Sequence, residues 1–199
     1  MYTYPVNLIL EGRKCLIVGG GRVASRKLER LIESGVLITI ITPEASQAIE
    51  SAAEIGKILL VKKEFSLEDL AGFHLVFAAT ADRELNRQII QTAAQQGITC
   101  CAVDENWSDG SFITPASITS GDITLAVSSQ GTACRKSRLI KDNLARHIDC
   151  IENAELTVIG TDHEHLPLSE REPLHLVDER LEKAGAMLNQ IWGIQGFAL

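Results

Sequence analysis

Long apolar runs are missing from this chain. Its 199 residues contain no stretch of about 18 consecutive apolar residues, the length that a membrane-spanning helix needs. The N-terminal segment MYTYPVNLILEGRKC has a short apolar patch, but neither a basic start nor a small-residue cleavage site. We therefore expect no membrane span and no secretory signal, and a cytoplasmic protein whose 45% hydrophobic residues form one ordinary core.

Motifs for metal binding and nucleophilic catalysis are missing as well. The five cysteines are odd in number and lack CxxC spacing, which predicts reduced thiols and no metal site. The adjacent Cys100 and Cys101 would face opposite sides of a strand, either as two core or edge positions or as a redox pair. No Ser-His-Asp signature or Walker lysine motif occurs, and His163-x-His165 is either metal-like or plain surface.

Positive charge is scarce in the C-terminal quarter. Residues 1–150 are nearly neutral, with 16 Lys and Arg against 17 Asp and Glu, whereas residues 151–199 have 3 basic and 9 acidic residues. This asymmetry indicates a separate C-terminal module and argues against a nucleic-acid partner for it.

The sequence does contain a regular alternation of strand and helix patterns. Apolar and β-branched runs predict strands at residues 14–18, 36–41, 58–61, 74–79 and 98–103. Helical segments are predicted at residues 22–33, from Thr42-Pro43 onward, at 66–70 and at 82–96. This order is typical of an α/β fold with a Rossmann-like parallel sheet.

The pattern changes after Asp104. Short strands at 113–118 and 123–127 and a helix at 134–148 predict a small α+β region that cannot bury a core alone. We therefore expect a homodimer. The predicted organisation is a Rossmann domain at 1–112, a dimerisation region at 113–150 and a short acidic appendage at 151–199.

The spacing Gly19-x-Gly21-x-x-Ala24 follows the first predicted strand and opens the first helix, as in dinucleotide-binding sites. The first glycine permits the turn, the second lets the backbone approach a pyrophosphate, and the small third residue lets helix and strand pack closely. The motif predicts nucleotide binding, and the alternative is a glycine turn that binds nothing.

Two further positions lie where a dinucleotide would bind. Glu44, the first carboxylate after the second strand, is either a ribose contact or a helix N-terminal charge. No arginine follows it to hold a 2′-phosphate, so NAD is favoured over NADP. Thr80 is a candidate cofactor contact after the fourth strand, whereas Asp82 is expected to cap the next helix.

Asp104 follows the fifth strand, at the edge where open α/β sheets bind their ligands. A carboxylate there could serve in acid–base catalysis, or it could simply form a turn. Basic residues near the fingerprint are either a functional patch or a solvated helix face: Arg13, Lys14, Arg22, Arg26, Lys27 and Arg30.

Four segments of the chain resemble the precorrin-2 dehydrogenase family, the dehydrogenase and chelatase part of siroheme synthases. They are CLIVGGGRVASRKLERLIESG, VFAATAD, CAVDENWSDGSFITPASI and ITLAVSSQGTACRKSRLIKDNL, in this order between Asn7 and Leu144. The resemblance implies NAD-dependent oxidation of precorrin-2 to sirohydrochlorin by a homodimer, followed in some members by insertion of ferrous iron.

The same resemblance implies roles for individual residues. It makes Asp104 the catalytic carboxylate, either as general base in dehydrogenation or as an aid to proton removal and metal entry. It places Ser128 in the tetrapyrrole cleft. The implied cofactor contacts are Gly21, Arg22, Val23, Pro43 and Glu44. Basic groups that could hold the carboxylates of the substrate are Arg135, Lys136, Arg138 and Lys141.

The chain departs from this family in two places. Many relatives have a proline opening the helix after the SSxGT loop, where this chain has Ala133-Cys134, which leaves the fine shape of the substrate cleft open. The segment TVIGTDHEHLPLSERE resembles the opening of glutamyl-tRNA reductase, and the chain ends before that family's catalytic cysteine. We interpret residues 154–199 as the truncated beginning of a fused reductase without that activity, or as an independent acidic appendage.

These observations favour an NAD-dependent precorrin-2 dehydrogenase. Two alternatives stay open at this point: a chelatase that has lost its oxidation step, and a module that binds NAD and regulates a partner.

Overall fold

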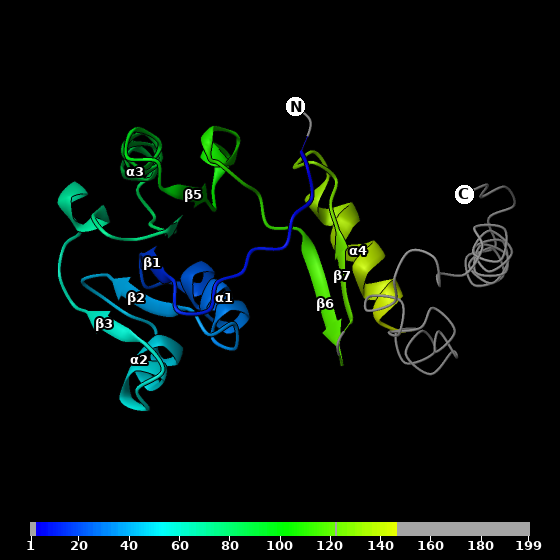
Figure 1. Cartoon of the computed structure of the whole chain (residues 1–199), viewed down its shortest axis with the longest axis horizontal. Coiled ribbons are helices and arrows are strands. Elements are labelled where there is room, and N and C mark those ends of the chain that lie inside the picture. Colours follow the sequence, from blue (N-terminus) through cyan, green and yellow to red (C-terminus); the bar gives the residue numbers. More distant parts are fainter. Residues whose placement is uncertain (1–2, 122, 147–199) are drawn as a thin grey trace, which may run out of the picture. The chain divides into compact units, whose positions relative to one another are not determined.

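A computed structural model describes residues 3–121 and 123–146. Its main sheet has five parallel strands in the order β3-β2-β1-β4-β5 (Figure 1). The strands are β1 (Lys14–Val18), β2 (Leu37–Ile41), β3 (Leu59–Val61), β4 (Leu75–Ala78) and β5 (Thr99–Ala102). The strand order reverses between β1 and β4, so the ends of these two strands border the position where such sheets bind a ligand.

Helices cover both faces of this sheet. They are α1 (Arg22–Leu31), α2 (Gln47–Glu54) and α3 (Arg83–Gln95), with 3-10 turns η1 (Leu67–Leu70) and η2 (Glu105–Asp109). Side chains of α1 and α2 share one buried cluster with one face of the strands, and side chains of α3 and η1 share a second cluster with the other face. The prediction of a Rossmann-like α/β fold is confirmed.

The two neighbouring cysteines of β5 illustrate this two-sided burial. Cys100 and Cys101 are 1% and 3% exposed and belong to different clusters, because successive side chains of a strand point to opposite faces. Burial raises the pKa of the Cys100 thiol to about 12, and it also raises the pKa of Cys101. Both are core positions, so the redox-pair alternative is wrong.

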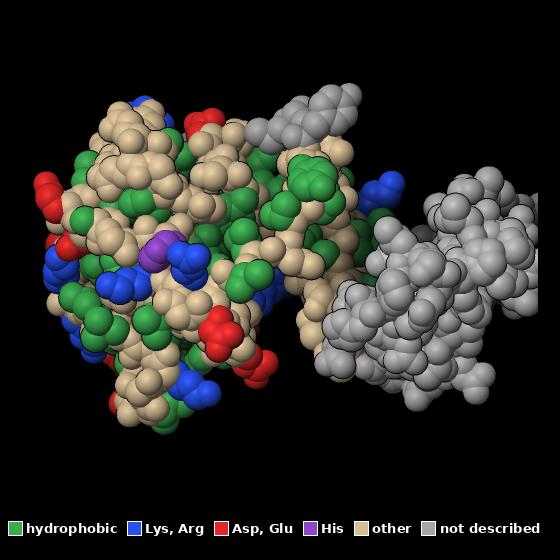
Figure 2. Space-filling model, in the orientation of Figure 1, with side chains coloured by type: hydrophobic (Ala, Val, Ile, Leu, Met, Phe, Trp, Pro, Cys, Tyr) green, Lys and Arg blue, Asp and Glu red, His purple; other side chains and the backbone are tan. Residues whose placement is uncertain are grey.

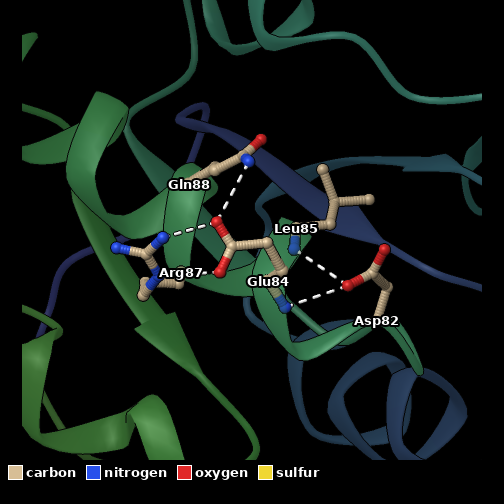
Figure 3. Close-up of polar contacts among 5 residues, drawn as sticks. All are labelled: Asp82, Glu84, Leu85, Arg87 and Gln88. Carbon is tan, nitrogen blue, oxygen red and sulfur yellow. Dashed lines mark hydrogen bonds and ion pairs between the residues drawn. The ribbon is translucent and has the colours of Figure 1, made fainter.

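Helix α3 begins as its sequence predicts. The Asp82 carboxylate accepts hydrogen bonds from the backbone N–H groups of Glu84 and Leu85, at 2.9 and 3.1 Å (Figure 3). On the exposed side of the first turn, Glu84 pairs with Arg87 and accepts a hydrogen bond from Gln88 at 3.2 Å. The predicted cap therefore forms, and it fixes the register of the whole helix.

Other boundaries differ from the predictions. The helix expected from Thr42-Pro43 begins only at Gln47, after Ser46, because the buried Thr42 hydroxyl donates to the Glu44 carbonyl at 2.7 Å and holds a bend instead. Helix α1 ends at Leu31, two residues earlier than expected. The strand expected at 113–118 is shifted to residues 116–120.

After η2 the chain forms a two-stranded sheet of β6 (Ala116–Ser120) and β7 (Ile123–Val127), followed by α4 (Cys134–Ala145) (Figure 1). By its internal contacts, the chain forms two units. Residues 1–119 and 124–145 make the first, which carries every site described below. The predicted domain boundaries stay predictions, and the appendage at 151–199 lies outside the described residues.

Candidate functional site

The glycine turn after β1 packs against the ends of both neighbouring strands. Gly19 has φ +111°, a conformation that favours glycine, and its N–H donates to the Ile41 carbonyl at 2.9 Å. A Cβ on Gly19 would overlap the Ala79 carbonyl, and a Cβ on Gly20 would overlap the Glu44 carbonyl. The turn is thus restricted to glycine by the folded chain itself.

Gly21 lies in a different environment. It is the residue before α1, and a Cβ built on it would meet no atom within 4 Å. The first turn of α1 contains no acidic residue. Two residues into the helix, Ala24 is fully buried against the sheet. This open helix N-terminus beside a glycine turn fits a pyrophosphate, which the N–H groups and the helix dipole would hold.

The other predicted cofactor residues lie around this turn. Pro43 and Glu44 are exposed in the bend after β2, and the Ser46 N–H donates to the Gly20 carbonyl at 2.9 Å. Because α2 begins at Gln47, the reading of Glu44 as a helix N-terminal charge is wrong, and its ribose contact stays a prediction. On the other side, the Thr80 nitrogen lies 3.1 Å from the Cβ position of Gly19.

Asp104 is half-buried after β5, and a side chain that sequence reasoning missed contacts it. Asn86 of α3 is fully buried, and its Nδ2 donates to Asp104 Oδ2 at 2.7 Å. The same amide exchanges hydrogen bonds with Thr80, so the loops after β4 and β5 are joined through one side chain. In the sequence, the one signal for Asn86 is its position four residues after the predicted helix cap Asp82.

A cleft of about 770 Å³ opens beside Asp104. Within the described part of the chain, Asp104 is the only carboxylate among the lining residues. Six lining residues are cationic: Arg22, Arg26, Lys27, Arg30, Arg138 and Lys141. On the face shown in Figure 2, by contrast, acidic and basic side chains are scattered among hydrophobic ones over the parallel-sheet part. The cleft therefore concentrates positive charge around a single acid.

Lys27 is more enclosed than the three arginines of α1 that line the cleft. Its Nζ donates to Thr114 Oγ1 at 2.6 Å and lies 5.1 Å from the centre of the Phe77 ring. Burial lowers the pKa of Lys27, and the nearby Arg30 and Arg26 lower it further, against an opposing effect of Cys101. Lys27 is thus not part of a merely solvated helix face. Together with Arg30, which donates to the Pro115 carbonyl at 3.3 Å, it holds the segment that leads to β6.

The loop after β7 completes the lining with Ser128, while Arg138 comes from α4. Gly131 has φ +80°, and a Cβ there would overlap the ring of Trp107, a lining residue of η2 that sequence reasoning also missed. The Ser129 hydroxyl accepts from the Ala133 N–H at 3.0 Å, and α4 starts at Cys134 without a proline in its first turn. Val23 and Arg22 of α1 border both this cleft and the glycine turn.

The described residues contain neither a membrane-spanning helix nor a cluster of metal ligands. No helix among residues 3–121 and 123–146 is long and apolar enough to cross a membrane. In the same ranges, no group of three or more His, Cys, Asp or Glu side chains is arranged to hold a metal ion.

Residues 6–116 match the family described as "Putative NAD(P)-binding". The chain is 37% identical to the siroheme synthase of Photorhabdus laumondii over 140 residues, which is 70% of this chain and 30% of that protein. It is 38% identical to siroheme synthase 2 of Yersinia enterocolitica over 144 residues, again 30% of that protein. The chain thus spans about a third of the length of these relatives.

Among solved structures, the chain is similar to one described as SirC, precorrin-2 dehydrogenase. The match has a TM-score of 0.64 and 28% sequence identity, and covers 73% of this chain and 71% of that one. The comparisons confirm the resemblance drawn from the four motif segments, the Rossmann-like fold and the expected dinucleotide-binding domain.

Proposed function

Because the chain belongs to the NAD(P)-binding family that it matches over residues 6–116, we propose that it oxidises precorrin-2 to sirohydrochlorin with NAD, a step of siroheme synthesis. The observation that carries this proposal is the cleft. It combines one carboxylate, Asp104, with six cations, and it borders the glycine turn through Arg22 and Val23. The named relatives are consistent with this reaction.

The charge of the cleft matches the substrate. Precorrin-2 is a polycarboxylate, and arginine and lysine side chains bind carboxylates through charge-assisted hydrogen bonds. Cations line the cleft from two sides, with Arg22, Arg26 and Arg30 on α1 and Arg138 and Lys141 on α4. A ring with several carboxylate side chains could therefore be bound at several points while one edge of the ring faces Asp104.

The reaction removes a hydride and a proton from the reduced ring, giving sirohydrochlorin, NADH and H⁺. NAD, when bound, accepts the hydride. The Asp104 carboxylate takes the proton as general base, and Asn86 donates a hydrogen bond to one of its oxygens at 2.7 Å. The other residues of the cleft orient the substrate and exclude water from it.

The choice of NAD over NADP rests on the bend after β2. The residues from Thr42 to Ser46 read TPEAS and contain no basic side chain for a 2′-phosphate. Glu44 is the carboxylate available there for the ribose hydroxyls. Pro43, Glu44 and Thr80 are therefore part of the proposed cofactor site.

The proposal extends to assembly and compartment. Helix α4 buries only Ser137, and Leu139 is 58% exposed, so its apolar residues are available to a second copy of the chain in a homodimer. The four described cysteines are free thiols, which suits the reducing cytoplasm.

The direct test is anaerobic incubation of the purified protein with precorrin-2 and NAD, following NADH by absorbance. We expect NADH from the natural sequence and a loss of at least about 100-fold in Asp104→Ala, the scale of a lost general base. Asp109→Ala is the matched control, because Asp109 is an exposed acid of η2 outside the cleft lining. NAD binding without NADH from the natural sequence would contradict the proposal and favour a sensing role.

A further inference from the structure

The Asn86 side chain is a buried polar group with hydrogen bonds to the loops on both sides of it. A carboxamide offers two acceptor positions and two donor hydrogens. Its Oδ1 accepts from the Thr80 N–H at 3.2 Å and lies 2.8 Å from Thr80 Oγ1, whose single hydrogen can go either to this oxygen or to the Asp82 carbonyl at 2.9 Å. Its Nδ2 donates to the Thr80 carbonyl at 3.1 Å and to Asp104 Oδ2 at 2.7 Å. Both amide hydrogens and at least one of the two acceptor positions are therefore used.

A buried carboxamide destabilises the fold unless its donors and acceptors are hydrogen-bonded. Asn86 is 0% exposed, and an unsatisfied amide that is buried in this way loses its hydration without compensation. An apolar residue would fill this helix position without that risk. The position therefore needs an explanation other than packing alone.

Helix α3 places the amide accurately. Asp82 caps the helix, and the Asn86 N–H donates to the Asp82 carbonyl at 3.0 Å, so Asn86 lies one turn into the helix. The capped first turn sets the position of the amide relative to the loops after β4 and β5. One of these loops carries Thr80 and the other carries Asp104.

We propose that Asn86 is a positioning residue, whose amide fixes the Asp104 carboxylate in the cleft and ties it to the Thr80 loop on the cofactor side. The catalytic part of this inference rests on the proposed dehydrogenase function. By holding Oδ2, the amide sets which way the carboxylate faces, and Oδ1 of Asp104 is directed by the same contact. The Thr80 loop and the Asp104 carboxylate then stay in a fixed position relative to each other.

The isosteric change Asn86→Asp separates this role from packing. It retains the size of the side chain and the acceptor for Thr80, but it removes the Nδ2 donor and places a second carboxylate beside Asp104. We expect kcat at saturating NAD and precorrin-2, counted per NAD-binding site, to fall about 10- to 100-fold, the scale of a lost hydrogen bond to a charged group. The KM for NAD should change less than the kcat.

Ile90→Val is the matched control. Ile90 is a buried residue of the same helix, 3% exposed, and has no polar contact with the cleft. Its variant should lower thermal stability while kcat per site stays within about twofold of the natural sequence, because the change removes only one methylene. A kcat of Asn86→Asp equally close to the natural value would overturn the positioning role.

A second measurement does not depend on activity. The free energies of unfolding of Asn86→Ala, Asp104→Ala and the double variant form a mutant cycle. A coupled contact predicts that the double variant loses less stability than the sum of the single variants, whereas additive losses would overturn the contact. If the natural sequence makes no NADH, the proposed function fails, and this cycle still decides whether Asn86 holds Asp104.

Discussion

Three consecutive glycines serve two different purposes at the scale of single residues. Gly19 and Gly20 are needed by the fold, because a Cβ on either would overlap a backbone carbonyl in the loop that follows a neighbouring strand. Gly21 has φ −85° and open space at its Cβ position, so no contact among the described residues requires glycine there. What requires it, in our proposal, is the close approach of the cofactor pyrophosphate.

This difference predicts opposite behaviour of two alanine variants. Gly20→Ala should lower the free energy of unfolding by about 1–3 kcal/mol, the usual cost of overpacking. Gly21→Ala should leave stability unchanged but weaken NAD binding about tenfold or more, since the same overpacking cost would fall on the complex. Urea unfolding and calorimetric titration with NAD measure the two effects. A Gly21→Ala protein with unchanged NAD affinity would contradict the assignment.

At the scale of elements, two helices each connect the sheet to the cleft. Helix α1 presents its N-terminus to the glycine turn, while Lys27 and Arg30 further along contact the segment leading to β6. Helix α3 is capped by Asp82 and carries Asn86 one turn later. Each helix thus links its N-terminal end to residues further along that contact the region of the cleft. A change at the start of either helix is therefore expected to affect the site.

The cap of α3 can be tested against a neighbouring surface contact. Asp82→Ala should lower the free energy of unfolding by about 1 kcal/mol, because it leaves two N–H groups of the first turn without their acceptor. Glu84→Ala removes the exposed ion pair with Arg87 and should cost less, since water screens that pair (Figure 3). Equal losses in urea unfolding would argue against the cap as the stronger contact.

At the scale of the whole molecule, the region after η2 has little of its own to bury. The two-stranded sheet of β6 and β7 has no fully buried side chain among its described residues, and none of the apolar positions Leu139, Ile140 and Leu144 of α4 is fully buried. The cleft nevertheless takes several lining residues from this region. The stability of the region after η2 therefore depends on a further surface that covers these apolar residues.

We expect a second copy of the chain to do so. Sedimentation equilibrium should give twice the chain mass of 21.7 kDa, and Leu139→Asp should shift the protein towards monomer, because a charge on an apolar contact must lose its hydration. Leu59→Asp is a control, since Leu59 is similarly exposed, at 61%, but lies in the edge strand β3. A natural sequence that sediments only as monomer would contradict the dimer.

Local patterns were sufficient for the parallel sheet. Strand β1 follows its apolar run from Lys14 to Val18, and the cap at Asp82 and the strand β7 also lie where the sequence predicts them. Each of these features depends on a few consecutive residues. The helix expected at Thr42-Pro43 failed for the opposite reason: a cap and a proline permit a helix start, but the Thr42 hydroxyl bonds to Glu44 and the bend packs against Gly20.

The sequence by itself determined the fold class, the glycine turn and the candidate carboxylate Asp104, because hydrophobic period, turn residues and strand ends are local properties. Only the tertiary structure decided which distant residues meet. It separated Lys27 from the solvated basic residues by placing it against Thr114 and Phe77, and it joined Asn86 to Asp104, 18 residues away. Such contacts depend on how strands and helices pack, and no spacing along the chain encodes that packing directly.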